Sequence, residues 1–493
     1  MSNNQSGTTK QFYTLYQHDS YHVGTLVYTK NTLAKLFFWL IWGDVCYMLM
    51  ENVIPSLLPL RFQALHATNL TIALIMSTIP NIINSVFNPI ISFKSDRYRS
   101  RWGRRIPFIV ATLPFLVLSI IGLGFTGPLS RWLNLHLGSV LHMSVVGLDI
   151  ATIGFFMISF TFFNSFVGSV FWYLFNDVVP EHLLARFMSL FRLFSLLSVS
   201  GFSFFIFPLA GTHFTAILVT ISLLYFFGFG LMCLMVKEGE YPPSPAYVDG
   251  RANVISAVKT YAKECLTLPH YWLVFLTTCF STVSAAAGAG GFMLFFYEST
   301  GLGLRQVGEV VGAVNIAVAI MIPFSGWLAD RFHPLRVVIV GYWINLLIVL
   351  PATLVWLFWH PGAHIAFWVW MGVSVLLIAP SQALLGVYDP PVFMVVFPRS
   401  RYGQFCSANA MLRSIAGIIA GVGVGVFYDF AGHYMNKTQV YRLMPIWQIL
   451  FTIPALICVL LLYRSWKRYG GDDNYTPPVP GETTDEMLAG VSS

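Results

Sequence analysis

The feature that most constrains the fold is a series of twelve apolar segments, each long enough to cross about 30 Å of hydrocarbon. They run approximately over 33–60, 69–92, 107–126, 147–176, 188–210, 213–236, 270–298, 306–328, 336–358, 364–388, 403–430 and 443–463. Only 10% of the 493 residues are charged, whereas a soluble domain has about 25%. A water-soluble core cannot hide so much apolar surface. Since open strands would leave backbone groups unpaired in lipid, the sequence predicts an all-α polytopic membrane protein.

Positively charged residues predict how these segments are oriented. Loops rich in Lys and Arg stay on the cytoplasmic side of a membrane. With both termini in the cytoplasm, few of the 28 Lys and Arg residues fall outside, namely Arg61, Arg131, Arg305, Lys437 and Arg442. The sequence therefore predicts an even number of helices in an integral protein of the plasma (inner) membrane, in contact with lipid. The net charge of +7 follows from this topology, and we expect no nucleic-acid partner.

A polar stretch in the middle of the chain divides the sequence into two halves. We expect a cytoplasmic segment at 1–32, six-helix halves at 33–236 and 269–465, a cytoplasmic linker at 237–268, and a cytoplasmic tail at 466–493. The tail is rich in Pro, Gly and Asp, and its composition predicts disorder. Several apolar segments contain a proline that predicts a kinked helix. These prolines are Pro55, Pro80, Pro114, Pro323 and Pro380.

Two short patterns recur at equivalent places in the two halves. Asp96-Arg97 follows the second apolar segment, and Asp330-Arg331 follows the eighth. The pattern P-x5-[RQ]-F-x-S follows the fourth segment at 180–189 and the tenth at 398–407. These repeats indicate two six-helix units related by an axis along the membrane normal.

The loop between the second and third segments reads S-D-R-Y-R-S-R-W-G-R-R-I-P at 95–107. It resembles the loop between helices 2 and 3 of the major facilitator superfamily. In the form D-R-x-R-S-R-[WF]-G-[KR]-x-x-P it is similar to the branch of glycoside–pentoside–hexuronide:cation symporters and sucrose–proton symporters. The second copy, G-W-L-A-D-R at 326–331, fits the pattern G-x-x-x-D-R, whereas the first copy has Ser92 in place of the glycine. The resemblance implies the major facilitator fold, with twelve transmembrane helices in two six-helix halves.

The resemblance also implies that the two copies of this pattern control the cytoplasmic gate. In the family, an acid at this place holds the gate against basic loop residues and a helix N-terminus. We expect Arg97, Arg104 and Arg105 to be the partners of Asp96. The residues given a gating role by the resemblance are Asp96, Arg97, Gly103, Arg104, Arg105, Gly326, Asp330 and Arg331.

Two carboxylates in the first apolar segment are candidates for coupling to an ion. Asp44 and Glu51 are seven residues apart, so they lie on one helical face about two turns apart, and Tyr47 shares that face. An uncompensated carboxylate at membrane depth costs roughly 2.5–3.5 kcal/mol on insertion scales, so it normally faces a cavity or a partner. We expect at least one of the two to bind a proton or sodium. The alternatives are a place near an aqueous end and a structural pair with an arginine.

Neutral polar side chains are candidates for binding a substrate. Ser77, Asn81, Asn84 and Asn88 have the spacing of one helical face, and an amide suits sugar hydroxyls because it both donates and accepts. Interhelical hydrogen bonding is the alternative for each of them, and Asn88, next to the predicted gate, is the least expected ligand. The substrate-binding candidates are Tyr47, Ser77, Asn81, Asn84, Asn164, Asn315 and Gln382, with Trp343 and Asn345 as further residues that could face a cavity.

The fourth apolar segment resembles helix 4 of the sucrose symporters, with two departures. Asp177 falls on the acid at the end of that helix and Asn164 on one of its asparagines. Thr161 stands where those symporters have a membrane-buried acid, and Trp172 stands near their arginine. This sequence therefore lacks the residue that couples the proton in those symporters, and we expect an acid of the first apolar segment to take that role. In the eleventh segment, Arg413 requires an acid partner or water.

These observations predict a secondary active transporter that couples uptake of a sugar or glycoside, a disaccharide among the candidates, to a proton or sodium by alternating access. We expect it to act as a monomer without a cofactor. The alternatives are an exporter or carrier of another small solute, a non-transporting membrane sensor and a membrane-embedded enzyme. The sequence has no phosphate loop, dinucleotide-binding pattern, metal-ligand spacing or nucleophile elbow. His360, His364 and Asp389 are too unspecific to support catalysis, so we expect no enzyme.

Overall fold

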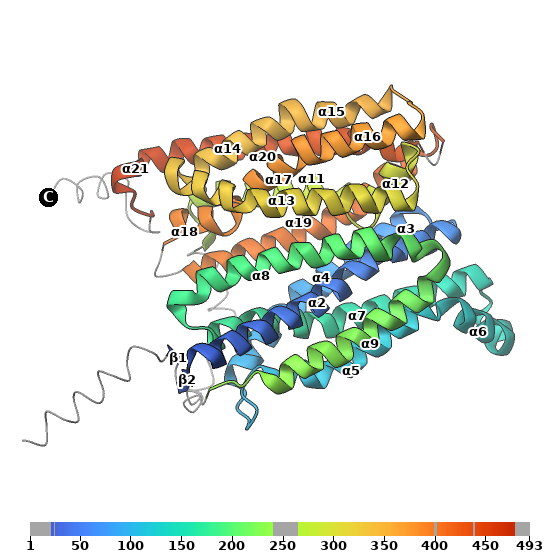
Figure 1. Ribbon diagram of the computed structural model, residues 1–493. Helices are drawn as coiled ribbons and strands as arrows, with labels where there is room; N and C mark the ends of the chain where they lie inside the picture. Colours follow the sequence, from blue (N-terminus) through green and yellow to red (C-terminus); the bar gives the residue numbers. More distant parts are fainter. Residues whose placement is uncertain (1–20, 24, 240–264, 399–401, 437–438, 479–493) are drawn as a thin grey trace, which may run out of the picture. The chain divides into compact units, whose positions relative to one another are not determined.

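The computed structural model describes residues 21–23, 25–239, 265–398, 402–436 and 439–478 (Figure 1). This part of the chain is helical apart from one hairpin, so the predicted all-α class is confirmed. The hairpin pairs β1 (Tyr21–Val23) with β2 (Leu26–Tyr28) in antiparallel fashion, with Tyr21 opposite Tyr28. It lies in the N-terminal segment predicted at 1–32, where the sequence analysis expected no strand.

Ten helical stretches in the described residues are long and apolar enough to cross a membrane. One of them, Phe187–Met235, has 49 residues, which is about 73 Å of helix and therefore enough for two crossings. A further predicted segment, 270–298, is divided into α11 (Pro269–Ala286) and α12 (Phe292–Ser299) by a turn with Gly290 and Gly291 at positive φ. All twelve predicted segments thus have a helical counterpart, which is consistent with the predicted twelve-helix fold.

The chain divides into two compact units whose bounds differ from the predicted halves. Unit 1 comprises Met1–Val53, Val86–Ser198 and Thr215–Ala246, and unit 2 comprises Ile54–Ser85, Val199–Phe214 and Tyr247–Ser493. Parts of the first, second and fifth predicted segments therefore pack with the second predicted half. Residues 240–264 of the predicted linker lie outside the described residues, so the division at 237–268 stays a prediction.

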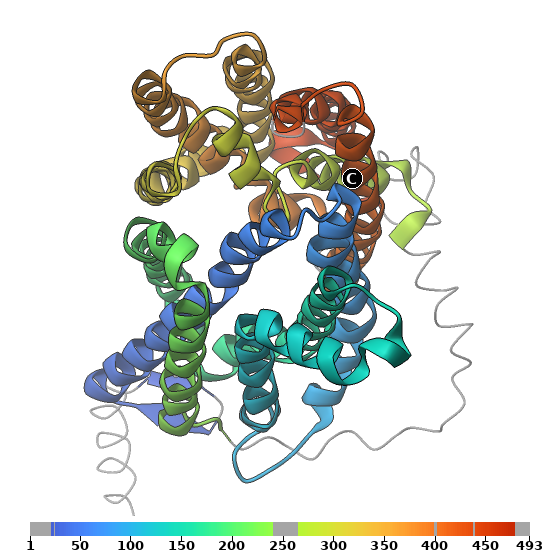
Figure 2. The same cartoon turned by 90° about the vertical axis from the view of Figure 1, so that its right-hand side faces the viewer.

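Unit 1 contains helices that run roughly parallel, as the view along their axes in Figure 2 shows. α5 and α7 pack along each other, and α6 packs on α7. α6 lies between the third and fourth predicted segments and was not expected from the sequence. The elements of this unit are the first part of α2 (Lys30–Ala64), the later part of α4 (Ile79–Arg97), α5 (Ile106–Gly124), α6 (Thr126–Leu141), α7 (Val145–Val178), most of α8 (Glu181–Gly201) and most of α9 (Ala210–Met235).

Unit 2 contains the remaining helices and a core that includes Tyr271, Phe275 and Trp466. α11 packs against both α19 and α20, and α13 and α14 pack against α17. Besides α11, α12 and the ends of α2, α4, α8 and α9, its elements are α3 (Asn69–Ala73), η1 (Leu74–Thr78), η2 (Phe202–Ile206), η3 (Phe207–Leu209), α13 (Leu304–Phe332), α14 (Pro334–Ile344), η4 (Asn345–Val349), α15 (Leu350–Leu354), η5 (Val355–Leu357), α16 (Ala363–Val373), η6 (Ser374–Ile378), α17 (Ala379–Leu385), η7 (Tyr388–Val392), α18 (Phe393–Val396), α19 (Tyr402–Ala431), η9 (Val440–Leu443), α20 (Met444–Arg468) and α21 (Gly471–Asn474).

Prolines widen the helices locally at four places. The π-helical segments η1, η2, η4 and η6 each end two residues before a proline. A proline lacks an N–H group and its ring clashes with the preceding turn, so the helix relaxes into a wider turn. These prolines are Pro80, Pro208, Pro351 and Pro380. The expected distortion is thus seen at Pro80 and Pro380, whereas Pro55, Pro114 and Pro323 lie inside continuous α-helices.

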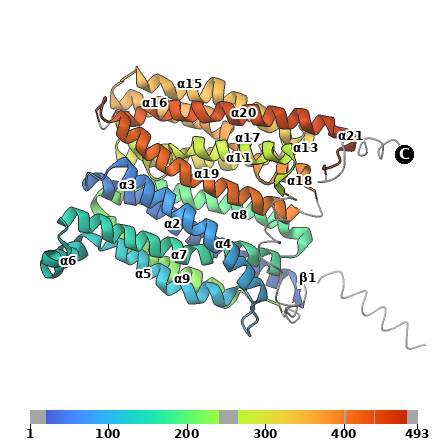
Figure 3. The same ribbon diagram turned by 180° about the vertical axis from the view of Figure 1, so that it is seen from behind.

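Glycines allow close helix packing within unit 2. α19 lies beside α3 and η1 (Figure 3). A Cβ atom on Gly421 would lie 2.4 Å from Oγ1 of Thr78, and one on Gly425 would lie 2.7 Å from Cα of Leu70. In a second contact of this unit, between α13 and η2, a Cβ atom on Gly308 would lie 2.3 Å from the carbonyl oxygen of Ser203. Both contacts therefore require the absence of a side chain.

The first part of the predicted tail is folded, which differs from the disorder expected for it. α20 continues to Arg468 and is followed by α21. The hydroxyl of Tyr475 donates to the carbonyl oxygen of Val396 at 2.8 Å, and the hydroxyl of Tyr271 donates to that of Pro478 at 2.8 Å. These aromatic side chains anchor a polar segment that composition alone assigns to disorder. Residues 479–493 lie outside the described residues.

Candidate functional site

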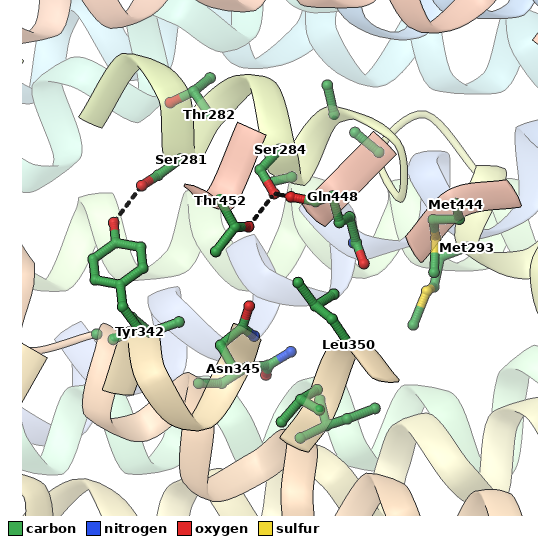
Figure 4. A pocket seen from close by; sticks show the side chains of 18 of the residues that line it. Ser281, Thr282, Ser284, Met293, Tyr342, Asn345, Leu350, Met444, Gln448 and Thr452 are labelled. Carbon is green, nitrogen blue, oxygen red and sulfur yellow. Dashed lines mark hydrogen bonds between the residues drawn. The ribbon is translucent and has the colours of Figure 1, made fainter. Parts of the chain in front are cut away.

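A cavity of about 600 Å³ lies within unit 2 (Figure 4). Its walls come from η1 and α4, from α11 and α12, from the helices between 334 and 392, and from α19 and α20. Of the predicted substrate-binding residues, the structure places Ser77, Asn81 and Gln382 on these walls, together with Asn345. Their hydroxyl and amide groups come from three separate segments of the chain and converge on one space.

Hydroxyl groups on α11 connect the cavity walls to one another. Ser281 is hydrogen-bonded to the hydroxyl of Tyr342 at 2.5 Å. Ser284 is hydrogen-bonded to Thr452 at 3.0 Å and donates to the carbonyl oxygen of Gln448 at 3.1 Å. These bonds tie α11 to α14 on one side and to α20 on the other, so they fix the positions of the polar groups that face the cavity.

An ion pair between Asp389 and Arg413 also lies on the cavity wall. Nη1 of Arg413 is 2.6 Å from Oδ2 of Asp389, and its Nε donates to Oγ1 of Thr282 at 3.2 Å. The side chains of Arg413 and Asp389 are 48% and 41% exposed, so a solute in the cavity can reach the pair. Oδ1 of Asp389 has no hydrogen-bond partner among the described residues.

The structure supplies the acid partner that the sequence required for Arg413. The sequence analysis considered Asp389 only as a catalytic residue, for which it was too unspecific, and did not identify it as the partner of Arg413. The signal that could have found it is the D-P-P sequence at 389–391, where the backbone of Asp389 leaves the helical region at φ −105° and ψ 125°. An acid at such a break can turn away from its own helix towards a neighbouring one.

The two acids of the first predicted helix lie in unit 1, in a group that we call the acid cluster: Asp44, Tyr47, Glu51, Asn164 and Ser195. Asp44, Tyr47 and Ser195 are buried, and Glu51 and Asn164 are half-buried. Asp44 is fully buried, and its Oδ2 accepts a hydrogen bond from Oγ of Ser195 at 2.5 Å. Oδ1 of Asp44 has no hydrogen-bond partner within the described part of the chain. Oε1 of Glu51 accepts from Nδ2 of Asn164 at 2.5 Å, and Tyr47 is also hydrogen-bonded to Glu51.

The acid cluster brings together four predicted residues, to which the sequence had assigned two different roles. Asn164 and Tyr47 were proposed as substrate ligands, and here they are hydrogen-bonded to Glu51. Ser195 was missed, because a serine in an apolar helix gives no signal on its own. Arg192, one turn before Ser195 on α8, is exposed and attracts Asp44 electrostatically.

The other predicted polar residues lie elsewhere. Asn84 and Asn315 are half-buried and do not line the cavity, and Nδ2 of Asn315 donates to the carbonyl oxygen of Val311 in its own helix. Asn88 accepts a hydrogen bond from Ser169 at 3.1 Å within unit 1. Thr161, at the place of the sucrose symporters' acid, is buried and donates to its own helix. The polar face predicted for the second helix is therefore divided: Ser77 and Asn81 line the cavity in unit 2, whereas Asn88 contacts Ser169 in unit 1.

The basic loop at 94–105 ends in a network of charged groups in unit 1. Arg104 binds Asp177 through two nitrogens, and Nε of Arg105 is 3.1 Å from Oδ2 of the same carboxylate. Arg105 also donates to Oγ of Ser95 at 2.5 Å and lies over the ring of Tyr173. The side chains of Asp96 and Arg97 lie outside the described residues, so their expected pairing stays a prediction.

A second acid, Glu238, holds the beginning of α5. Its carboxylate oxygens accept hydrogen bonds from the backbone N–H groups of Arg104, Arg105 and Ile106 at 2.9, 2.8 and 2.7 Å. Gly103, at φ +98°, leaves room for Glu238, since a Cβ atom there would lie 2.4 Å from its carboxyl carbon. The sequence analysis missed Glu238; the available signal was an acid directly after the sixth apolar segment, on the same predicted side as the basic loop.

The second copy of the gating pattern is differently placed. Asp330 is exposed and has no ion pair among the residues that the structure describes. Arg331 lies over the rings of Trp327 and Phe332, at 5.4 and 5.5 Å. A Cβ atom on Gly326 would meet nothing within 4 Å. The gating role of these three residues stays a prediction.

A bundle of membrane-spanning helices around a cavity lined by both polar and apolar side chains is an architecture of membrane transporters, and comparisons with known proteins agree. A family model described as MFS/sugar transport protein matches residues 40–466. The chain belongs to this family of the major facilitator superfamily, and it is an integral membrane transporter rather than an enzyme. The predicted superfamily is thereby confirmed, while the symporter branch stays a prediction. No curated protein matches the sequence significantly.

Solved structures of transporters share the fold at low sequence identity. A bacterial homologue of the human lysosomal transporter Spinster has a TM-score of 0.63 and 15% identity, covering 92% of this chain and 100% of the other. The nucleoside transporter NupG has a TM-score of 0.61 and 9% identity, covering 87% and 100%. A D-xylose–proton symporter has a TM-score of 0.55 and 13% identity, covering 85% and 96%. At these identities the likeness establishes the fold.

Proposed function

We propose that the protein takes up a sugar or glycoside together with a cation, by alternating access. The cavity in unit 2 is the observation that supports this most directly. Hydroxyl and amide groups from several helices face it, and each can both donate to and accept from a sugar hydroxyl. The family description names sugar transport, and one protein with this fold is a D-xylose–proton symporter.

The acid cluster is the proposed coupling site. Asp44 and Glu51 are hydrogen-bonded by neutral groups, Ser195, Asn164 and Tyr47. A buried carboxylate whose contacts are neutral is costly when charged, and binding of a proton or cation removes that cost. We propose that occupancy of this site by a proton, with sodium as the alternative ion, permits the conformational change that carries the substrate across. We place both termini in the cytoplasm and the protein in the plasma membrane.

Uptake by proteoliposomes tests this function. Labelled sucrose, maltose and a β-glucoside are offered with and without an inward proton gradient. We expect accumulation that requires the gradient and is lost in Asp44→Asn or Glu51→Gln protein that inserts normally. Asp472→Asn is the matched control, because this carboxylate is 46% exposed, lies outside the acid cluster and does not line the cavity, so accumulation should stay intact.

Each other outcome changes a defined part of the proposal. Full accumulation in both Asp44→Asn and Glu51→Gln proteins would refute the coupling site. A response to a sodium gradient alone would change the ion. Flux only in the outward direction, measured in everted vesicles, would identify an exporter, and an absence of flux with every sugar would refute the substrate class.

A further inference from the structure

The wall of the cavity formed by α11 and α12 changes from polar to apolar along its length. At one end it presents Thr278, Ser281, Thr282 and Ser284, and at the other it presents alanines followed by Met293 and Phe296. The change occurs near the turn between the two helices, so hydroxyl groups belong to α11 and the sulfur and ring atoms belong to α12.

Three other walls of the cavity also change from polar to apolar side chains towards the same end, although the chain runs in different directions along them. From the polar end outward, Tyr342 and Asn345 are followed by Val349 and Leu350 between α14 and α15. Along α20, Thr452 and Gln448 are followed by Met444. On the segment from η7 back to α16, Asp389 and Gln382 are followed by Ile378 and Trp370. One chemical pattern is thus built independently on four walls.

Direct contacts show that the four polar parts meet at one end. Ser281 bonds to Tyr342, Ser284 bonds to Thr452, and Thr282 accepts from Arg413, which pairs with Asp389. We call this the polar end of the cavity. Figure 4 shows these hydroxyl groups on one side of the cavity, with Met293 and Met444 together on the other.

The apolar parts meet in the same way. A Cβ atom on Gly288 would lie 3.6 Å from the sulfur of Met444 and 3.8 Å from that of Met293. The rings of Phe296 and Trp370 are 5.2 Å apart in an edge-to-face arrangement. Together with Leu350 and Val349, these side chains form the apolar end of the cavity.

Two polar groups near the apolar end are already hydrogen-bonded within the protein. The indole N–H of Trp370 donates to Thr300 at 3.0 Å, so Trp370 can contact a ligand only through the apolar surface of its ring. The hydroxyl of Thr353 donates to the carbonyl oxygen of Leu350 at 2.9 Å in its own helix. A second sugar ring at this end would leave several hydroxyl groups without partners, which disfavours binding.

We propose that the ligand of this cavity is an amphipathic glycoside, with its sugar at the polar end and an apolar aryl or alkyl aglycone at the apolar end. This proposal rests on the proposed transport of a sugar or glycoside. The Asp389–Arg413 pair is self-neutralising, and its side chains are 41% and 48% exposed on the cavity wall, which suits an uncharged sugar. The distance from Tyr342 to Leu350 is eight residues of helix, roughly 12 Å, which accommodates one sugar ring with an aglycone. Met293 and Met444 are flexible and can adapt to aglycones of different shape.

Equilibrium binding to the purified full-length protein tests the proposal without requiring transport. Isothermal titration calorimetry compares methyl and phenyl β-glycosides of glucose, galactose and xylose, with sucrose and maltose alongside. We expect the phenyl member of the pair with the preferred sugar to bind about ten-fold more tightly than the methyl member, because its ring is removed from water in an apolar pocket. Both disaccharides should bind more weakly than the phenyl glycoside.

Two substitutions separate the ends of the cavity. Met293→Gln keeps an unbranched side chain of similar length and should weaken the phenyl member more than the methyl member, so that the preference for phenyl falls to about two-fold or less. Asp389→Asn should weaken both members of the pair by a similar factor. Met394→Gln is the matched control, because Met394 is 62% exposed on α18 and does not line the cavity.

Two results would overturn the proposal, and they differ in what else they affect. If sugars bind but phenyl and methyl members are equal, or a disaccharide binds most tightly and Met293→Gln leaves the ratios unchanged, the amphipathic ligand is refuted and sugar transport stands. If no sugar or glycoside binds at all, the proposed function itself is refuted, and this inference with it.

Discussion

Asp429 and Asn69 are 360 positions apart in the chain and are joined by two hydrogen bonds, from the backbone and the side-chain nitrogens of Asn69 to Oδ1 of Asp429 at 2.9 Å each. Oδ2 of Asp429 accepts from the backbone N–H of Leu70 at 2.8 Å, and Tyr441 donates to Oδ1 of Asn69 at 2.7 Å. The first N–H groups of a helix have no partner within it, so a carboxylate there satisfies them and also complements the helix dipole. α3 lies in the first predicted half and α19 in the second, so in the proposed alternating-access cycle this contact would break and reform.

Removal of the carboxylate should weaken this contact. Asp429→Ala leaves the N–H groups of Asn69 and Leu70 unpaired, which costs about 1–3 kcal/mol. We expect faster amide hydrogen exchange at 69–73 and a lower thermal unfolding midpoint in the same detergent. Asp472→Ala, which removes a 46% exposed aspartate, is the control; it should leave exchange at 69–73 unchanged and shift the midpoint little, since an exposed ion pair contributes about 0–1 kcal/mol. Unaltered exchange at 69–73 in the Asp429→Ala protein would show that the contact is not formed in the membrane protein.

Glycines on α19 give a second test of the same packing. A methyl group on Gly425 would meet the backbone of Leu70 at 2.7 Å, so the two helices have to move apart. We expect Gly425→Ala to destabilise the protein by about 1–3 kcal/mol, in the range for overpacked sites. Gly372→Ala is the matched control, since a methyl group there meets nothing within 4 Å, and alanine is favoured over glycine in a helix by up to about 1 kcal/mol. Equal unfolding midpoints for both variants would contradict the close approach of α19 and α3.

Glu238 should contribute more to stability than an ordinary surface acid. It accepts from three backbone N–H groups at the start of α5, and Glu238→Ala leaves them without that partner at a cost of about 1–3 kcal/mol. Glu238→Gln retains one acceptor oxygen, so its stability should lie between that of the unaltered protein and that of Glu238→Ala. The control is Glu309→Ala, which breaks an i,i+4 pair with the 83% exposed Arg305 and should cost at most about 0.5 kcal/mol. Thermal unfolding of the three variants measures the difference, and equal losses for Glu238→Ala and Glu309→Ala would refute the capping role.

The number and positions of the spans could be predicted from the sequence because apolar length is a local property of the chain. The need of Arg413 for an acid was predictable for the same reason, since a charge within an apolar helix is visible in the sequence alone. The identity of that acid was not, because it depends on which helix packs beside α19. Periodicity likewise placed Ser77, Asn81 and Asn88 on one face, but that face is longer than the cavity, and its last member reaches Ser169 instead.

The Asp389–Arg413 pair should affect substrate binding much more than stability. Both side chains are more than 40% exposed, and ion pairs of this kind contribute about 0–1 kcal/mol, so Asp389→Asn or Arg413→Gln should shift the unfolding midpoint little. The pair lines the cavity, so we expect either substitution to lower the apparent affinity for the transported solute by ten-fold or more. Arg413→Lys should be nearly as harmful, because an ammonium group cannot hold Asp389 and Thr282 with the geometry of the guanidinium.

The Arg336–Asp472 pair is the natural control for this prediction. Its side chains are 41% and 46% exposed, which closely matches the Asp389–Arg413 pair, but neither residue lines the cavity. Concentration-dependent uptake should therefore show an unchanged apparent affinity in Asp472→Asn protein and a reduced one in Asp389→Asn protein, at similar unfolding midpoints. Equal affinities in the two variants would mean that the charged pair on the cavity wall serves only to hold α19 against its neighbours, because a ligand contact cannot be neutralised without a change in binding.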